Sequence, residues 1–355
     1  MARRPDVRTA SLPIALVDAA GLAQQLATAL VRVPFRSPWR GPDDAIHNLG
    51  QSVTSEVIRT FMGYSASLPI EEFRSIEAGI DSLARAVLAP VVSSEGVDQA
   101  DAELGGVPGV RYRPKAGDPV GRIVYLHGGG YVGTSPNMYA FFTARLAAIT
   151  GCEVFVADYR LAPEFPYPAG VEDAVAVLDA LVAEGHDPSH LFLAGDSGGG
   201  GLACSVVHDR RAAHLPELGG LLLFSPEVDL RLDQPSVTEN ADRDILPWNI
   251  PTSAYLHGHA DDESVDALLQ DVGQWPPVYL CWGGDEMFRD AISLLAEHLD
   301  ASPTEAVALE CPGMFHVFPI LMPWAEASRT VYDQVAAFVA ERVEAADRPP
   351  VAPVD

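Results

Sequence analysis

Short apolar segments alternate with helical patterns along this chain from about residue 108 to residue 345. Apolar segments of strand length occur at 122–127, 152–159, 191–196, 220–226, 277–283 and 307–311. Helical patterns follow at 137–150, 169–184, 198–211, 289–300 and 323–345. Strands that are apolar throughout and are joined by helices are typical of a parallel sheet covered on both faces. We therefore expect an α/β fold with a mostly parallel central sheet.

The first hundred residues show helical patterns at about 15–31, 43–63 and 70–89, and no clear strand alternation precedes residue 108. In the third helix, apolar positions spaced by three and four predict one buried face, made of Phe73, Ile76, Ile80, Leu83 and Val87. We expect an amphipathic helix near the N-terminus, and neither a signal peptide nor a spanning helix, because Asp18, Gln24 and Gln25 interrupt its apolar residues.

The segment GDSGG, residues 195–199, follows a predicted strand and precedes a predicted helix. The pattern G-x-S-x-G in this context predicts a tight strand-to-helix turn, for which Gly195 and Gly199 leave room. Such a turn strains Ser197 and exposes its hydroxyl at the carboxyl edge of the sheet, beside the unpaired N–H groups of the helix N-terminus. Ser197 is therefore the candidate nucleophile.

Three consecutive glycines follow an earlier predicted strand in HGGGYV, residues 127–132. The N–H groups of such a run can point into a cavity without obstruction by side chains, as an oxyanion hole requires. We predict that Gly129, Gly130 and Gly198 donate these N–H groups and that His127 holds the loop. A phosphate-binding loop is the competing interpretation, but no Lys-Ser/Thr follows the glycines.

Two later loops supply a candidate base and a candidate acid. His316 lies between the last predicted strand and the final helix, after the nucleophile and an acid in chain order. The segment GGDEMFRD, residues 283–290, holds two adjacent acids, Asp285 and Glu286. A carboxylate here would accept the Nδ1–H of the imidazole and stabilise the imidazolium. Neighbours on an extended loop point in different directions, so only one of the two acids can face His316.

Taken together, these motifs resemble the hormone-sensitive-lipase family of α/β-hydrolases, the group with an HGGG loop. The resemblance covers about residues 108–345 and rests on HGGGYVGTS, DYRLAPEFPYPAGVED, GDSGGG, SPEVDL, GGDEMFRD and GMFHVF in that order. It implies an α/β-hydrolase fold with a helical cap and carboxylic-ester hydrolysis that uses neither a metal nor an organic cofactor. The corresponding division is a cap and lead-in over 1–105, a catalytic domain over 106–347 with an excursion at 231–272, and a tail at 348–355.

The sequence departs from the family pattern in two places. The residue after the nucleophile is usually alanine in the family, and here it is Gly198. The family's acid lies in a D-P-L-x-D segment, and an alignment without a gap on Asp290 puts Glu286 at the acid position, thirty residues before His316. This alignment favours Glu286, whereas a shift of one residue would favour Asp285.

Composition limits the partners and the compartment. The net charge of −26 argues against nucleic acid and anionic membrane surfaces as partners. The four cysteines lie in or beside apolar segments without CxxC spacing, so we expect free buried thiols and a cytoplasmic protein. The expected partner is a small-molecule ester, and a homodimer through an edge strand is compatible with the predicted sheet.

Residues outside the main motifs are predicted to have supporting roles or no catalytic role. Asp158 and Arg160 are predicted to form an ion pair that supports the oxyanion loop. The histidine-containing segments 186–190 and 257–263 are interpreted as surface loops and not as metal sites. Aromatic residues of the cap and the excursion could line an apolar pocket, namely Phe35, Trp39, Phe61, Tyr64 and Trp248.

Three alternatives to a short- to medium-chain carboxylesterase remain. The same triad would serve a specialised lactone, carbamate or aryl-ester hydrolase, or an acyltransferase with an acceptor site that excludes water. A ligand-binding protein on the hydrolase scaffold typically lacks a triad member, and all three types are present here. The HGGG loop argues against a serine peptidase of the same superfamily.

Overall fold

A computed structural model describes residues 7–33, 45–246, 252–260 and 262–348. Its centre is one eight-stranded sheet in the order β1-β2-β4-β3-β5-β6-β7-β8. The strands β3 to β8 run parallel, and β1 and β2 pair antiparallel, so the predicted mostly parallel sheet is confirmed. The strands are β1 (Val97–Leu104), β2 (Val107–Pro114), β3 (Arg122–Leu126), β4 (Glu153–Ala157), β5 (Leu191–Asp196), β6 (Gly220–Phe224), β7 (Val278–Gly283) and β8 (Ala306–Cys311).

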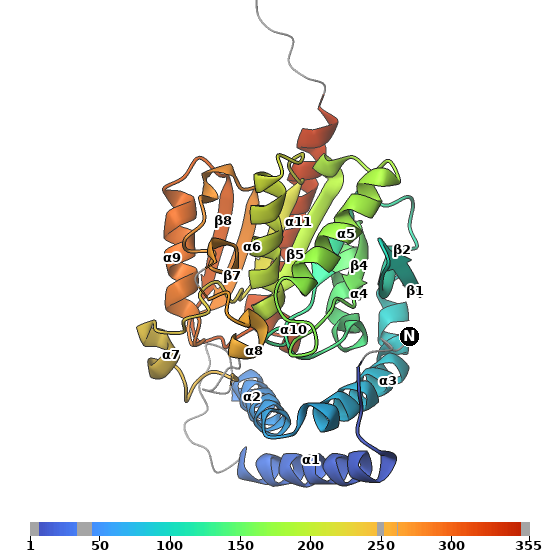
Figure 1. Ribbon diagram of the computed structural model, residues 1–355, viewed down its shortest axis with the longest axis vertical. Helices are drawn as coiled ribbons and strands as arrows, with labels where there is room; N and C mark the ends of the chain where they lie inside the picture. The colour runs from blue at the N-terminus through green and yellow to red at the C-terminus, as the bar shows by residue number, and fades with distance from the viewer. Residues whose placement is uncertain (1–6, 34–44, 247–251, 261, 349–355) are drawn as a thin grey trace, which may run out of the picture.

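Long helices cover both faces of this sheet (Figure 1). One face packs against α5 (Ala169–Ala183), α6 (Ser197–Ala212) and α9 (Arg289–Asp300), and the other against α4 (Ala140–Thr150) and α11 (Glu326–Asp347). Alternate residues of β3 belong to the two separate cores, because successive side chains of a strand point to opposite faces. The shorter helices are η2 (Pro136–Tyr139), η3 (Pro188–His190), α7 (Pro235–Glu239), α8 (Thr252–Leu256), η4 (Glu263–Val265), η5 (Val272–Gln274) and α10 (Phe318–Leu321).

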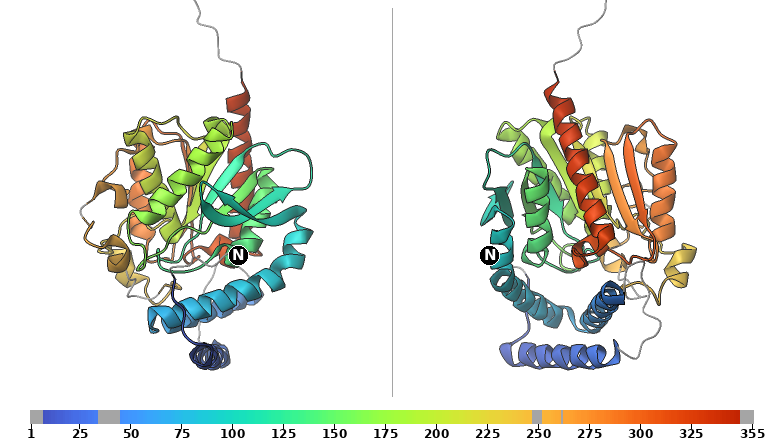
Figure 2. Two further views of the ribbon diagram at one scale, coloured as in Figure 1. Left: turned by 45° about the vertical axis from the view of Figure 1, so that its right-hand side comes forward. Right: turned by 180° about the vertical axis from the view of Figure 1, so that it is seen from behind.

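Three N-terminal helices lie beyond the carboxyl edge of the sheet, where the loops after the strands gather (Figures 1 and 2). They are α1 (Leu12–Arg32), α2 (Ala45–Ala66) and α3 (Ile70–Ser94), close to the predicted ranges. The excursion at 231–272 forms no strand in its described part and touches this layer: Arg59 of α2 donates hydrogen bonds to the carbonyls of Ala241 and Asp242, both at 2.9 Å.

The strand β1 was not expected, and it places sheet structure ahead of residue 105. Its sequence VDQADAEL is rich in acids because β1 is an edge strand, and only its first residue, Val97, is fully buried. Gly105 and Gly106 both have positive φ and make the turn into β2. The start of the sheet therefore lies within the segment assigned to cap and lead-in.

The predicted buried face of α3 is wrong at two of its five positions. The side chains of Leu83 and Val87 are 62% and 60% exposed, whereas Arg74, Ile76 and Val92 are the buried residues of this helix. The helix is rotated so that a polar group, Arg74, faces the loop after β3. Arg74, which is buried and has several partners, thus lies on a face that hydrophobic spacing alone does not predict.

The orientation of α1 also differs from that of an ordinary amphipathic helix. Its buried residues are Asp18, Leu22 and Ala29, while Val17 and Val31 on the outer side are 71% and 70% exposed. By length and composition α1 is the one helix in the described residues that is apolar enough to cross a membrane, and 17% of that window is buried.

Candidate active site

The nucleophile turn joins the end of β5 to the start of α6. Ser197 has φ of +50°, so the strained left-handed conformation predicted for it is present. Close approach of the backbone requires both flanking glycines: a Cβ at Gly195 would overlap the carbonyl of Gly199, and a Cβ at Gly199 would overlap that of Leu126. The turn therefore presents the Ser197 hydroxyl at the carboxyl edge of the sheet.

Ser225, which follows β6, connects the segments that hold the serine, the histidine and the acid. The N–H of Ser197 donates to the Ser225 carbonyl at 3.1 Å. The Ser225 hydroxyl donates to Oε2 of Glu286 at 2.6 Å and accepts the N–H of Val317 at 3.0 Å. Residues 120 positions apart in the chain, Ser197 and Val317, thus bond to one residue that sequence reasoning did not identify.

The two candidate acids have different surroundings. Glu286 is fully buried, and its Oε2 lies 3.8 Å from Nδ1 of His316. Asp285 points elsewhere: it is partly exposed and lies 3.6 Å from the guanidinium of Arg243. Glu286 is also fixed by the N–H of Gly283, which donates to Oε2 at 3.1 Å. Of the two, only Glu286 is close to the imidazole.

His316 is almost completely buried, and its Nε2 has no hydrogen-bond partner among the described residues. The structure thus brings His316 and Glu286 together but records no hydrogen bond from Ser197 to the imidazole. Such bonds are often long without substrate and shorten in the reactive complex. Burial lowers the pKa of His316, but nearby Glu286, with Asp244 and Asp196, outweighs burial and leaves the pKa above its usual value.

Asp244, in the excursion, fixes the backbone of the loop that holds Glu286 and of the loop that holds His316. Its carboxylate accepts the N–H of Met287 at 2.7 Å and the N–H of His316 at 3.0 Å. Burial raises its pKa to about 6, despite the opposing charge of His316. The sequence ADRDILP did not indicate this role, because it holds two acids in a segment without periodicity.

The glycine loop after β3 lies against the nucleophile turn. Gly129 and Gly130 have φ of +113° and +59°, and within the described chain the N–H groups of Gly129, Gly130 and Gly198 have no acceptor. A Cβ on Gly198 would lie 3.0 Å from the nitrogen of Tyr131, so the absence of a side chain at residue 198 permits this close approach. Three unpaired donors thus lie around the turn.

Asp196, at the end of β5, connects the nucleophile turn to the start of the glycine loop. Its carboxylate accepts the N–H of Gly128 at 2.9 Å and the hydroxyls of Tyr125 and Tyr139 at 2.7 and 3.0 Å. Burial raises its pKa to about 6, and these hydrogen bonds limit the rise. The residue before the nucleophile therefore determines where the glycine loop begins.

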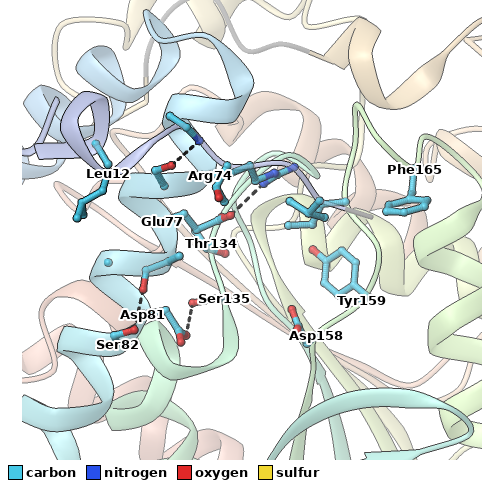
Figure 3. A pocket seen from close by; sticks show the side chains of 18 residues that line it. Leu12, Arg74, Glu77, Asp81, Ser82, Thr134, Ser135, Asp158, Tyr159 and Phe165 are labelled. Atoms are coloured by element: carbon cyan, nitrogen blue, oxygen red, sulfur yellow. Dashed lines mark hydrogen bonds and ion pairs between the residues drawn. The ribbon is translucent and has the colours of Figure 1, made fainter. Parts of the chain in front are cut away.

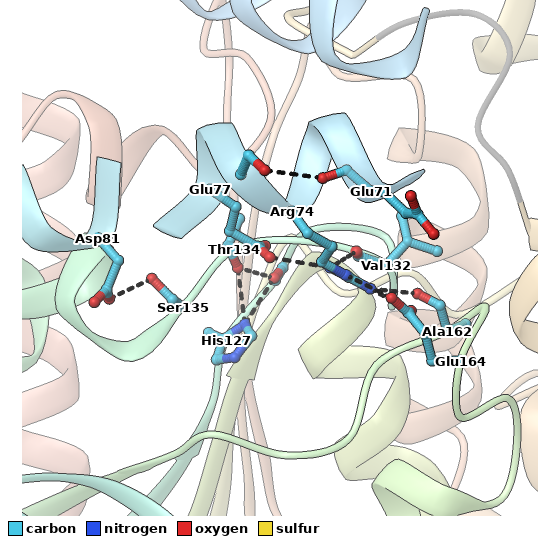
Figure 4. A network of polar contacts seen from close by, with 12 residues as sticks. Glu71, Arg74, Glu77, Asp81, His127, Val132, Thr134, Ser135, Ala162 and Glu164 are labelled. Carbon is cyan, nitrogen blue, oxygen red and sulfur yellow. Dashed lines mark hydrogen bonds and ion pairs between the residues drawn. The ribbon is translucent and has the colours of Figure 1, made fainter. Parts of the chain in front are cut away.

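Arg74 of α3 anchors the cap to the glycine loop (Figure 4). Its guanidinium donates to the carbonyls of Val132 at 2.6 Å and Ala162 at 2.8 Å and pairs with Glu164 at 2.8 Å. The predicted Asp158–Arg160 pair is wrong, because Arg160 pairs with Asp173 and Glu172 instead. The cap thus adds support to the end of the loop through Arg74.

His127 holds the loop from within, as predicted for a structural residue. Its Nδ1 lies 2.8 Å from the hydroxyl of Thr134, and its ring stacks on Tyr159 with a centroid distance of 4.6 Å. The hydroxyl of Thr134 also donates to the carbonyl of Gly128 at 2.5 Å. The side chains of His127 and Thr134 therefore hold the two ends of the HGGG loop together.

We expect Arg74→Met to destabilise the protein by about 3–5 kcal/mol, because it leaves buried carboxylates and carbonyls without their donor. Arg85→Met is the matched control, since Arg85 lies on the same helix in an exposed pair with Asp101, and it should cost less than about 1 kcal/mol. Urea unfolding of both variants measures the difference. Equal midpoints would show that Arg74 does not anchor the cap.

A cavity of about 730 Å³ lies between the cap and the glycine loop (Figure 3). Arg74, Glu77 and Asp81 of α3 line one side of it, and Tyr159 and Phe165 line the other. None of the candidate catalytic residues belongs to its lining. This cavity lies behind the glycine loop and is not the place where an ester would meet Ser197.

Glu227, in the segment SPEVDL, is a buried carboxyl near the imidazole that sequence reasoning passed over. It is 1% exposed, and neither oxygen has a hydrogen-bond partner within the described residues. Burial raises its pKa to about 7, while the charge of His316 opposes the rise. At lower pH this carboxyl is neutral and adds no charge beside His316.

The remaining predicted residues fall in three groups. All four cysteines are free and buried, as expected. No set of three His, Cys, Asp or Glu side chains gathers as a metal site in the parts of the chain that are described. Of the aromatic residues predicted to line a pocket, Tyr64 donates to the Asp18 carbonyl and so joins α2 to α1. Phe35, Trp39 and Trp248 lie outside the described residues, as does the tail 349–355.

Comparisons with known proteins identify the family of the chain. A family model described as the alpha/beta hydrolase fold matches residues 123–320. An acetyl-hydrolase of Streptomyces hygroscopicus is 31% identical over 222 residues, which cover 61% of this chain and 74% of that protein. The carboxylesterase NlhH of Mycobacterium tuberculosis is 32% identical over 223 residues, which cover 58% of this chain and 69% of that protein.

A solved structure described as a hormone-sensitive lipase from a metagenome library matches with a TM-score of 0.71 and 29% identity, over 82% of this chain and 98% of that one. The chain therefore belongs to the α/β-hydrolase-fold family. Within that family, matching solved structures include homologues of hormone-sensitive lipase, the group that the motifs resemble.

Proposed function

We propose that Ser197, His316 and Glu286 form the catalytic triad of this serine carboxylesterase. The chain is a carboxylic-ester hydrolase, in keeping with its esterase and carboxylesterase relatives. The observation that carries the triad is the network around Ser225, which joins the backbone of Ser197 to the Glu286 carboxylate and to the backbone after His316. Asp285 is left out because it pairs with Arg243.

In the first half of the reaction, Oγ of Ser197 attacks the ester carbonyl while Nε2 of His316 takes its proton. The carboxylate of Glu286 stabilises the imidazolium that forms. The N–H groups of Gly129, Gly130 and Gly198 hold the oxyanion, and one such donor contributes about 3–4 kcal/mol to the barrier reduction. Collapse of this intermediate breaks the C–O bond, and His316 protonates the departing alkoxide.

In the second half, a water molecule attacks the acyl-enzyme, and His316 removes its proton as the base. The product acid leaves when the Ser197 oxygen takes the proton back. Every proton passes through the one imidazole, so the chemistry needs neither a metal nor an organic cofactor. The raised pKa of His316 sets the acid limit of this activity, because the base must be neutral at the start.

The substrates are proposed to be esters of short to medium acyl chains. Two relatives are named acetyl-hydrolases, which favours small acyl groups. We assign residues 1–105, up to the β1–β2 turn, to the cap and lead-in that restrict access, and residues 106–347 to the catalytic domain. Location in the cytoplasm is proposed from the free thiols, and self-association, where it occurs, from the exposed edge strand β8.

The test of this function is turnover of p-nitrophenyl esters with two to sixteen acyl carbons. We expect kcat/KM to peak between two and eight carbons and to fall at least tenfold by twelve. A fluorescent phosphonate should label the native protein once, and peptide mapping should locate the label on Ser197. Turnover without labelling at Ser197, or no turnover of any ester by folded protein, would contradict the proposal.

A further inference from the structure

The outer side of α1 presents apolar side chains to solvent. Leu12, Leu16, Val17 and Val31 are between 62% and 72% exposed, although valine and leucine are normally among the buried residues. The views in Figures 1 and 2 agree that α1 is the outermost layer of the cap, with α2 and α3 between it and the sheet. This surface is therefore free of the rest of the described chain.

The exposed surface of α1 is apolar or uncharged up to Arg32, with Gln24, Gln25 and Thr28 as its exposed polar residues. Its one acid, Asp18, is turned inward and is 7% exposed, so its exposed surface carries no carboxylate. The exposed arginines Arg8 and Arg32 lie just before the helix and at its last residue. An apolar side bracketed by cations is the pattern of a helix that lies in a membrane interface.

The N-terminal part of the sequence is positively charged, whereas the rest of the chain is negatively charged. Residues 1–40 hold six of the 23 basic residues and two of the 49 acidic ones, so this segment carries +4 while the remaining 315 residues carry −30. Electrostatic forces are screened beyond about 10 Å at moderate salt. Of these basic residues, Arg8 and Arg32 lie in the described part of the chain at the two ends of α1, so a surface in contact with α1 meets these cations more strongly than the negative charge of the catalytic domain.

We propose that α1 docks this protein onto an anionic phospholipid surface, with its outer side in the headgroup region. The helix lies on the bilayer and does not span it, because Asp18 in its first half would be costly in hydrocarbon and Tyr64 of α2 is bonded to the Asp18 carbonyl. Docking brings the cap, to which we assign control of access, to the lipid surface. It is independent of the proposed chemistry.

A second copy of the chain fits this surface less well. If two α1 helices packed side by side, parallel or antiparallel, the arginines at their ends would lie next to each other and repel. The exposed sides of the helices carry no carboxylate that could neutralise this charge. The acidic catalytic domains would also repel each other. An anionic lipid surface supplies both the apolar layer and the opposite charge.

Vesicle flotation of the full chain tests the proposal. We expect binding to phosphatidylcholine vesicles with 30% phosphatidylglycerol, and at least tenfold weaker binding to phosphatidylcholine alone. Val17→Asp and Val31→Asp should each weaken binding roughly tenfold or more, because each places a charge in the apolar contact. The double variant Arg8→Gln/Arg32→Gln should reduce binding to anionic vesicles and its salt dependence.

Val120→Asp is the matched control, since Val120 is 47% exposed and lies in the catalytic domain before β3. It should bind as the wild type does, and turnover of a soluble ester should be unchanged in every variant. Equal binding to both vesicle types, or no binding at low salt, would overturn the proposal. So would a wild-type dimer in solution that Val17→Asp converts to a monomer while vesicle binding is absent.

Discussion

Replacing Ser197 by alanine is expected to lower kcat/KM for p-nitrophenyl butyrate by about 10⁵–10⁶-fold, because no other group in the site can form the acyl-enzyme. The change removes one oxygen from a side chain on a turn held by backbone contacts, so the fold should remain. Steady-state kinetics with active-site titration measures the loss. Circular dichroism and thermal unfolding establish that the variant is folded.

A matched control is Ser205→Ala, farther along α6, where the hydroxyl donates to the Ser264 carbonyl and does not face the candidate site. Its activity should stay within a few-fold of wild type. A second variant, Ser197→Gly, should be as inactive as Ser197→Ala but more stable by about 1 kcal/mol, since glycine relieves the strain at φ +50°. Turnover by folded Ser197→Ala within 100-fold of wild type would assign the nucleophile elsewhere.

What the sequence made predictable were features that depend on neighbouring residues. The strands and helices of the catalytic domain follow from apolar segments of characteristic length and spacing. The strained turn at Ser197 follows from glycines at fixed offsets, which only a close backbone approach explains. The edge strand β1 was missed because its acids hide the alternation that a half-buried strand otherwise shows.

What the sequence did not reveal were contacts between distant segments. Ser225 and Asp244 are one serine and one acid among many, and only the packing of β6, the excursion and the loop before α10 gives them their partners. Arg74 received no role from the sequence, yet its guanidinium donates from the cap to the carbonyls of Val132 and Ala162. Such roles depend on which surfaces meet, and local patterns carry no information about that.

Glu286→Gln is expected to lower kcat/KM by roughly 10³–10⁴-fold, while Asp285→Asn should stay within about threefold of wild type. The two residues are adjacent, but Glu286 lies 3.8 Å from Nδ1 of His316 and Asp285 pairs with exposed Arg243. Glutamine still offers one oxygen to Ser225 and Gly283, so the loop should keep its position. Kinetics at the plateau of the pH profile measures the difference.

The pH profile separates an electrostatic role of Glu286 from a merely structural one. The carboxylate helps to hold the pKa of His316 above its usual value, so the neutral base is lost as pH falls through that raised pKa. Removing the charge lowers the pKa and should move the acid limb of kcat/KM to lower pH, although Asp244 and Asp196 limit the shift. Asp285→Asn should leave the limb unchanged. An acid limb that stays in place in Glu286→Gln, or equal losses from the two variants, would mean that another group orients the imidazole.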